Sequence, residues 1–290
     1  MNANHALGYL VIDERQLSIA EAEALAASLG LVLVTPQQSE LINDSFKLFY
    51  RDGLWRAQLA NGKANTKTKT TNKTTNKTYV AIDFTDSKMR SRIKPGNLAG
   101  EYVVRAVLGR KKAAQTLTVV DATAGFGQDA FLLAAAGCQV TMIEQLPLLQ
   151  FLLRQALAID TQGNSEVREV LTRLQLQSGN SIDVMRNWQQ ARPDIVYLDP
   201  MYAQPEMGAA GLKKSAAVKK NMAFLQLLSA GYAHQHGEAD LYGNGMLTVA
   251  LTLALRKVIV KRAPNADWLD NIKPASSITG KAARFDIYPV

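Results

Sequence analysis

The sequence predicts an α/β protein in which a small N-terminal α/β domain precedes a larger domain built on a parallel sheet. From Thr116 onward, segments with strand periodicity alternate with segments of helical periodicity, as in repeated βαβ units. At the carboxyl end, two strand-like segments, 276–281 and 283–290, follow one another with no helix between them. We therefore expect a Rossmann-like sheet that closes with a hairpin whose last strand is inserted antiparallel.

The smaller domain is expected to span residues 1–85. A helix-like segment begins at Ser18 and ends at Gly30, and the pair Asp52-Gly53 marks a hairpin turn. Predicted strands and the hairpin occupy 7–13, 31–35, 46–59 and 79–84. Segment 61–78 repeats Thr, Asn and Lys without an aliphatic side chain larger than Ala, so we expect a flexible loop or linker there. A basic arm that touches RNA is the less favoured alternative.

The larger domain is expected to span residues 86–290. A basic loop leads into a helix within 85–109, and Pro147 is compatible with a helix because proline is tolerated in the first turn. The predicted strands are 116–122, 139–145, 173–181, 193–199 and 257–263, and the predicted helices are 129–137, 147–160, 219–231 and 244–254.

Composition narrows the class of protein. Hydrophobic residues make up 47% of the chain and charged residues 20%, which is enough apolar material for a core. The net charge of +8 favours a polyanionic partner, although charge alone is weak support. The single cysteine, Cys138, excludes an intramolecular disulfide and a cysteine-rich metal site, and the three histidines form no metal pattern. Met246–Leu255 is too short to span a membrane, and the N-terminus lacks a secretory pattern, so we expect a cytoplasmic protein without a membrane or metal.

The segment DATAGFGQDAF, residues 121–131, predicts a cofactor site after the first strand of the larger domain. Gly125 and Gly127 permit positive φ and close backbone approach, and Asp129 lies where the next helix begins. The free N–H groups at such a helix start favour a carboxylate, here the methionine end of S-adenosylmethionine. Glu144, nineteen residues after Gly125, ends the next strand, where its carboxylate can accept hydrogen bonds from both ribose hydroxyls.

Two further residues are expected on the cofactor's adenine. Asn180 and Ser181 follow the third strand of the parallel sheet, and ligands of open α/β sheets collect at the carboxyl ends of strands. The spacing from Gly125 to Glu144 also fits NAD enzymes, so this part of the sequence leaves both cofactors open.

The segment DIVYLDPMY, residues 194–202, predicts the catalytic loop. An exocyclic amine on a nucleic-acid base is a poor nucleophile, because its lone pair is delocalised into the ring. The Asp199 carboxylate, together with a neighbouring carbonyl such as that of Pro200, is expected to orient the amine toward the sulfonium methyl. Pro200 fixes the loop, and Tyr202 offers a ring for stacking on a base. These features indicate a nucleic-acid methyltransferase.

Basic residues near these loops are expected to contact RNA phosphates. Each lysine or arginine alone is more often part of a solvated face, but the cluster favours phosphate contact. The candidates are Arg90, Arg92, Lys94, Lys213, Lys214, Lys219, Lys220, Lys261 and Arg262.

The motifs DATAGFGQDAF, MIEQ, DIVYLDPMY, KKSAAVKKNM, VIVKRAP and RFDIY closely resemble the small-subunit ribosomal RNA methyltransferase J family over most of residues 80–290. This resemblance implies a Rossmann-like class I methyltransferase sheet and methyl transfer from S-adenosylmethionine to N2 of a guanine in 16S ribosomal RNA. The implied partner is 16S ribosomal RNA or the small ribosomal subunit. The implied cofactor contacts are Gln128, Asp129, Glu144, Gln145, Asn180, Ser181 and Asp199.

This chain departs from the family pattern at Gln128, at Gln145 and in segment 61–78. Gln128 and Gln145 stand where many members are expected to carry a basic residue, so only backbone contacts are secure there. Segment 61–78 is expected to be an insertion peculiar to this sequence. Met201 is a mild departure from the wider pattern of amino-methyltransferases, in which proline or another residue follows the Asp-Pro pair.

Three alternatives stay open at the level of sequence. An adenine-N6 methyltransferase acting on DNA or RNA shares the Asp-Pro-x-Tyr pattern. An NAD-binding oxidoreductase shares the glycine turn, but the terminal strand pair argues against it. A non-catalytic RNA-binding protein with a relic fold is disfavoured because Asp199 and Tyr202 are intact.

Overall fold

The computed structural model describes residues 7–12, 16–41, 45–59, 79–109, 116–159, 164–200, 216–236 and 245–290. These residues fall into two compact units. The first contains the described residues up to Ile82 together with helix α10 as far as Tyr232, and the second contains the remainder. The Thr- and Lys-rich segment 61–78 lies outside the described residues.

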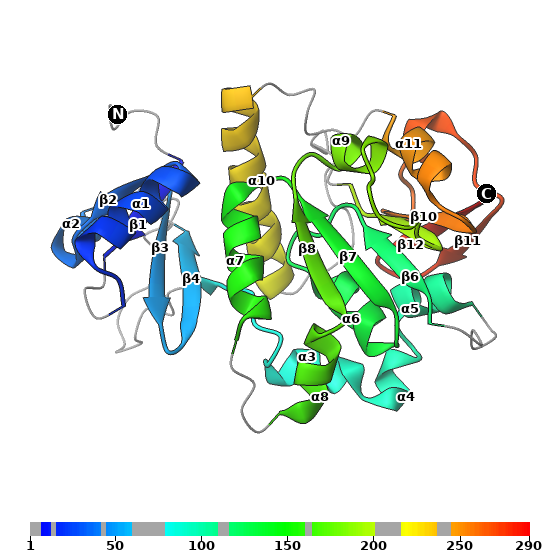
Figure 1. Ribbon diagram of the computed structural model, residues 1–290, viewed down its shortest axis with the longest axis horizontal. Coiled ribbons are helices and arrows are strands. Elements are labelled where there is room, and N and C mark those ends of the chain that lie inside the picture. The colour runs from blue at the N-terminus through cyan, green and yellow to red at the C-terminus, as the bar shows by residue number, and fades with distance from the viewer. Residues whose placement is uncertain are drawn as a thin grey trace, which may run out of the picture. The chain divides into compact units, whose positions relative to one another are not determined.

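The first unit is built on a five-stranded sheet in the order β2-β1-β3-β4-β5 (Figure 1). Strand β1 is parallel to β2 and β3, and the other pairs are antiparallel. The strands are β1 Gly8–Val11, β2 Leu31–Val34, β3 Phe46–Arg51, β4 Leu54–Leu59 and β5 Tyr79–Val80. The predicted strand 79–84 is wrong beyond Val80, because only Tyr79 and Val80 pair with β4. Further along, the Asp83 carboxylate accepts the N–H of Thr85 where the chain turns.

Local sequence signals account for the turns and helices of the first unit. Asp52 and Gly53 have φ of 52° and 79°, as a two-residue hairpin turn of this twist requires. Helix α1, Ile19–Leu29, starts with a capping box between Ser18 and Glu21 and ends at Gly30 with φ of 65°. A short helix, α2 Pro36–Glu40, was not predicted, although Thr35-Pro36 followed by Gln38 is a helix-start signal.

Helix α10, Ala216–His236, also packs within the first unit. Phe224 is fully buried, and its ring lies edge-to-face against Phe46 of β3 with the ring centroids 5.3 Å apart. The apolar pattern of residues 219–231 predicted this helix, but as part of the larger domain.

The second unit is built on a seven-stranded sheet in the order β11-β12-β10-β9-β6-β7-β8. Its strands are β6 Thr118–Asp121, β7 Gln139–Glu144, β8 Leu174–Ser178, β9 Ile195–Leu198, β10 Lys257–Arg262, β11 Ser276–Thr279 and β12 Arg284–Pro289. Strands β6 to β10 are parallel, and β12 lies between β10 and β11, antiparallel to both. The predicted terminal hairpin is therefore confirmed. Strand β6 pairs with both β7 and β9, so the strand order reverses there.

Helices cover both faces of this sheet (Figure 1). Helix α11 packs against α9, β9 and β10, where the buried side chains of alternate strand positions form one apolar cluster. Helix α6 packs against β7 and β8. The helices are α3 Ser87–Ile93, α4 Pro95–Leu98, α5 Tyr102–Leu108, α6 Gln128–Ala135, α7 Pro147–Leu157, α8 Ser165–Leu171, α9 Ser181–Arg186 and α11 Met246–Leu253, with a 3₁₀ turn at Leu269–Asn271.

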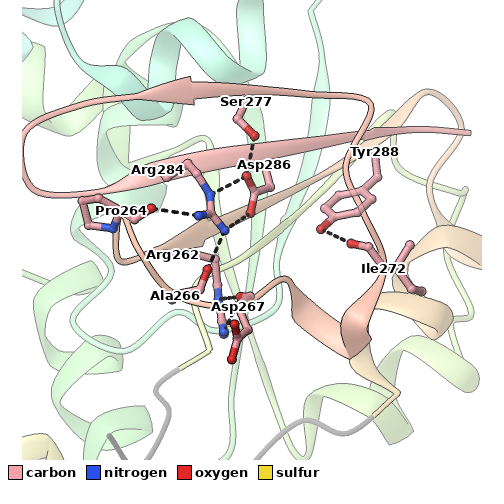
Figure 2. Close-up of polar contacts among 9 residues, drawn as sticks. All are labelled: Arg262, Pro264, Ala266, Asp267, Ile272, Ser277, Arg284, Asp286 and Tyr288. Atoms are coloured by element: carbon pink, nitrogen blue, oxygen red, sulfur yellow. Dashed lines mark hydrogen bonds and ion pairs between the residues drawn. The ribbon is translucent and has the colours of Figure 1, made fainter. Parts of the chain in front are cut away.

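A buried ion pair on β12 fixes the loop that follows β10 (Figure 2). The Arg284 guanidinium donates to both carboxylate oxygens of Asp286 at 2.8 and 2.9 Å, and Asp286 is fully buried. The remaining donors of Arg284 reach the carbonyl oxygens of Pro264 and Ala266, while Ser277 donates to Asp286. Arg284 and Asp286 are two positions apart on one strand, but Ser277, Pro264 and Ala266 reach them only through the pairing of β12 with β11 and β10, and the register of that pairing could not be predicted from the sequence.

We predict that Arg284→Met lowers the free energy of unfolding by about 3 to 5 kcal/mol, because it leaves the Asp286 charge buried without its partner. Arg256→Met is the matched control, since Arg256 pairs with Asp194 at 2.7 Å but its side chain is 53% exposed. That change is expected to cost about 1 kcal/mol or less. Urea unfolding measures both, and equal losses would contradict the prediction.

Candidate active site

The glycine turn joins β6 to α6 through a tightly packed corner. Gly125 and Gly127 both have positive φ, 54° and 68°, and the Gly127 N–H donates to the Ala124 carbonyl at 2.7 Å. A Cβ at Gly127 would lie 2.9 Å from Leu153 and 3.2 Å from Phe84. Only glycine fits this position, and the turn therefore brings the start of α6 close to the end of β6.

Glu144, at the end of β7, holds the glycine turn against the next loop. Its Oε2 accepts the Gly125 N–H at 2.9 Å, and its Oε1 accepts the Leu146 N–H at 2.8 Å. Burial raises the pKa of Glu144 to about 7, and these backbone hydrogen bonds oppose the rise. Its predicted contact with a ribose stays a prediction, while the structure adds a role in shaping the turn.

Asn180 and Ser181 both support the loop after β8. The Asn180 side chain caps α9 by accepting the N–H groups of Ile182 and Asp183, and its Nδ2 donates to Gln145. The Ser181 hydroxyl donates to the Ala122 carbonyl at the end of β6. These bonds bring the ends of β6, β7 and β8 together, and the adenine contact of the two residues stays a prediction.

The catalytic loop begins next to the glycine turn. The Asp199 N–H donates to Thr123 Oγ1 at 2.6 Å, although the two residues are 76 positions apart. Strand pairing explains this contact, since β6 and β9 are neighbours and Asp121 is registered with Tyr197. Pro200 is the last described residue of this loop, and Tyr202 lies outside the described residues.

Lys261 lies between the carboxylates of Asp129 and Asp199 and pairs with both. Its Nζ lies 2.7 Å from Asp129 Oδ2 and 2.9 Å from Asp199 Oδ2. The Tyr197 hydroxyl donates to the same Asp129 oxygen at 2.7 Å. Lys261 was expected on the RNA-binding surface, whereas its ammonium group is engaged by two carboxylates inside the site.

The charged groups of the site shift one another's pKa values. Burial raises the pKa of Asp121 to about 8. Burial also raises the pKa of Asp199, against the opposing effect of Lys261. For Asp129, burial acts in the same upward direction, but Lys261, Tyr197 and Arg92 outweigh it, and its pKa falls below the ordinary value. The ionised form is thus favoured most at Asp129.

The predicted phosphate contacts separate into three groups. Arg90 and Lys94 of the α3 region are exposed. Arg92 instead forms a two-bond ion pair with Glu101 at 2.7 and 3.0 Å, and Arg262 donates to the Asp267 carbonyl. Lys213 and Lys214, and the side chains of Lys219 and Lys220, lie outside the described residues.

The described residues contain no group of three acidic, histidine or cysteine side chains able to hold a metal ion.

The sheet and the site together define the class of protein. Numbering the strands of the second unit from one to seven in chain order gives the spatial order 3-2-1-4-5-7-6. The reversed last strand distinguishes this sheet from a wholly parallel dinucleotide-binding sheet, and the Asp-Pro loop lies beside the glycine turn. This arrangement is that of a class I S-adenosylmethionine-dependent methyltransferase.

Comparisons with known proteins agree. A family model described as "Putative SAM-dependent methyltransferase" matches residues 43–290. Ribosomal RNA small subunit methyltransferase J of Pseudomonas fluorescens (strain SBW25) is 39% identical over 210 residues, which cover 72% of this chain and 74% of that protein. The protein of that name from Pseudomonas syringae pv. syringae (strain B728a) is 36% identical, with 72% and 71% covered. The chain therefore belongs to the ribosomal RNA small subunit methyltransferase J family.

A solved structure extends the likeness to nearly the whole chain. The crystal structure of a SAM-dependent methyltransferase from Neisseria gonorrhoeae superposes with a TM-score of 0.62 at 27% sequence identity, and covers 97% of this chain and 95% of that one. The described part of the chain contains no helix that is both long enough and apolar enough to cross a membrane.

The chain's own residues fit the cofactor, S-adenosylmethionine. Gly127 lets the glycine turn pack closely on the core at Leu153 and Phe84, and Glu144 presents acceptor oxygens at the end of β7. The acidic side chains of Asp121, Asp129 and Asp199 suit a ligand with a sulfonium and an ammonium group.

We predict that Gly127→Ala weakens the affinity for S-adenosylmethionine at least about tenfold, because its Cβ crowds Leu153 and forces the turn outward. Gly137→Ala is the control, since Gly137 also has positive φ, 96°, but no atom lies within 4 Å of a Cβ there. Both variants are expected to lose about 1 kcal/mol of stability from backbone strain. Calorimetry that finds equal cofactor affinities for the two variants would refute the packing argument.

We also predict that the affinity for S-adenosylmethionine depends on pH through Glu144. The ionised carboxylate accepts hydroxyl hydrogen bonds, so affinity is full above the pKa of about 7 and falls by up to about tenfold per pH unit below it. Glu144→Gln should bind more weakly at pH 8, and its affinity should change less between pH 5 and 8 than that of the wild type, because only the other acidic residues of the site, such as Asp121 and Asp199, still titrate. A pH-dependent affinity that persists unchanged in this variant would assign the titration to another group.

Proposed function

We propose that this protein transfers the methyl group of S-adenosylmethionine to the exocyclic N2 amine of a guanine in 16S ribosomal RNA. The relatives named ribosomal RNA small subunit methyltransferase J support the substrate class. One observation supports the chemistry above the others. The Asp199 N–H donates to Thr123 at 2.6 Å, so the amine-binding loop starts beside the cofactor turn.

The proposed mechanism assigns the chemistry of the amine to Asp199. An Asp199 oxygen and the Pro200 carbonyl accept the N–H hydrogens, which directs the nitrogen lone pair toward the methyl group. When bound, S-adenosylmethionine supplies an activated methyl, so the N–C bond forms as the S–C bond breaks and S-adenosylhomocysteine leaves. The amine nitrogen then loses one proton, and Asp199 accepts it and passes it to water. Tyr202 is proposed to stack on the base.

The proposed cofactor contacts follow the three strand ends. Main-chain groups at Gly125, Gly127 and Gln128 approach the methionine end, and Asp129 and Asp199 face its positive charges. Glu144 and the Gln145 region bind the ribose. Asn180 and Ser181 lie beside the adenine, where their main-chain groups are the proposed contacts because both side chains already form hydrogen bonds.

For RNA, the proposed partner is 16S ribosomal RNA, either free or within the small ribosomal subunit. Among the described residues, Arg90 and Lys94 are the strongest candidates for phosphate contact, because they are exposed and lie near the start of the unit that carries the active site. Lys213, Lys214, Lys219 and Lys220 complete the proposal from sequence alone.

We predict that Asp199→Ala lowers kcat for methyl transfer at least about 100-fold while the protein remains folded, because the acceptor for the amine hydrogens is removed. Asp183→Ala, which removes an exposed carboxylate from the first turn of α9, is the matched control and should keep its activity. Circular dichroism checks the fold of both variants. Near-normal turnover by Asp199→Ala would overturn the assigned role.

The substrate is tested directly with ribosomal RNA from cells that lack this protein. The purified enzyme is incubated with labelled S-adenosylmethionine and either free RNA or small subunits, and the nucleosides are then separated. Label in N2-methylguanosine supports the proposal. Label in N6-methyladenosine, or no transfer to either substrate, contradicts it.

A further inference from the structure

Lys261 has two ion-pair partners, and both belong to the proposed reaction site. One is Asp129, at the start of α6, and the other is Asp199, after β9. The side chains of Lys261, Asp129 and Asp199 are 27%, 20% and 40% exposed, so the three groups are partly shielded from water and still accessible. An ammonium group held in this way has little freedom to serve as a contact for a distant phosphate.

Strand register explains why a lysine reaches this position. Ile259 of β10 is registered with Tyr197 of β9, and side chains two positions apart on a strand point to the same face. Lys261 and Asp199 each lie two positions further on, so they meet on the face that carries Tyr197. Pairing of β10 with β12 fixes Lys261 from the other side, where it is registered with Phe285.

The charges around Asp199 come from every element packed against it. Asp121 on β6 and Asp129 on α6 are acidic, and Tyr197 donates its hydroxyl hydrogen to Asp129. Arg262 on β10 acts at longer range, and Arg92 on α3 acts on Asp129. Among the described residues, Lys261 is the one cation in direct contact with the Asp199 carboxylate.

We propose that Lys261 is a positioning residue for methyl transfer. Its ammonium group holds Oδ2 of Asp199 and leaves Oδ1 to accept the hydrogen of the substrate amine. This inference rests on the proposed function, because it takes Asp199 as the group that binds the amine. The second ion pair, with Asp129, fixes the ammonium group of Lys261 itself. The Asp199 carboxylate is therefore held at a set angle relative to α6.

The same contact keeps Asp199 in the form that accepts a hydrogen bond. Burial and the neighbouring carboxylates favour protonation of Asp199, and the positive charge at 2.9 Å opposes both. Without Lys261, Asp199 would hold its proton to a higher pH. On acidification, the variant would therefore lose the activity that needs ionised Asp199 at a higher pH than the wild type does.

The test compares Lys261→Met, which removes the charge, with Lys261→Arg, which keeps it. Lys257→Met is the matched control on the same strand, since Lys257 is also partly buried and donates to the Ala106 carbonyl at 2.8 Å. For Lys261→Met we expect kcat at pH 7 to fall about 10- to 100-fold. The acid limb of the pH profile should move upward by about one pH unit or more. Lys261→Arg should recover most of kcat and the original limb, and Lys257→Met should change neither.

Calorimetry with S-adenosylmethionine gives a second readout that does not depend on turnover. Removing a cation from an acidic site should leave the affinity for this positively charged ligand unchanged or raise it. A Lys261→Met protein with much weaker cofactor binding and normal kcat would show Lys261 to be a cofactor ligand and would overturn the proposal. An unmoved acid limb would overturn it as well. If Lys261→Met does not fold, Lys261→Gln, which is neutral but keeps a hydrogen-bond donor, takes its place with the same expected results.

Failure of this inference differs from failure of the proposed function. If wild-type protein transfers no methyl group to ribosomal RNA, or if Asp199→Ala stays active, the proposed function fails before Lys261 is considered. If Asp199→Ala is inactive and Lys261→Met keeps the wild-type kcat and pH profile, only the role of Lys261 fails.

Discussion

The active site depends on the parallel pairing of β6 with β9. This pairing places the ends of two strands, about seventy residues apart in sequence, at the same edge of the sheet. Hydrogen bonds continue past the last registered pair, from Ala122 to Tyr197 and from Asp199 to Thr123. The glycine turn and the Asp-Pro loop are therefore held at a fixed separation before any ligand binds, which is the preorganisation that methyl transfer between two bound groups requires.

Burial and charge act against each other throughout this site. Asp121 and Glu144 have main-chain N–H groups as their direct described partners, and burial raises the pKa of both. Asp129 is different, because Lys261 and Tyr197 stabilise its charge and its pKa falls. Lys261 thus favours the ionised form of Asp129, whereas at Asp199 it opposes a rise in pKa that burial causes. A positively charged cofactor would extend the same effect to the carboxylates that Lys261 does not reach.

Much of this could be predicted from the sequence, because periodicity and turn residues act locally. Strand and helix patterns gave the parallel sheet, and two adjacent strand segments gave its antiparallel end. The sequence could not show that β5 ends after Val80, since the length of an edge strand depends on how far its neighbour β4 pairs with it. It also could not show the partners of Lys261, because only strand register brings Lys261 and Asp199 to one face. A lysine near the end of a strand looks the same in sequence whether it contacts phosphate or carboxylate.

The terminal hairpin gives the last link between fold and site. Strand β12 holds β10 along six registered pairs, which include Lys261 with Phe285 and Arg262 with Arg284. Arg284 also fixes the chain just beyond β10 through the carbonyls of Pro264 and Ala266 (Figure 2). The segment around Lys261 is thereby held by main-chain pairing on one side and by a buried guanidinium on the other. An ammonium group on a long, flexible side chain positions a carboxylate well only if its own backbone is fixed, and the antiparallel strand that closes the sheet supplies that constraint.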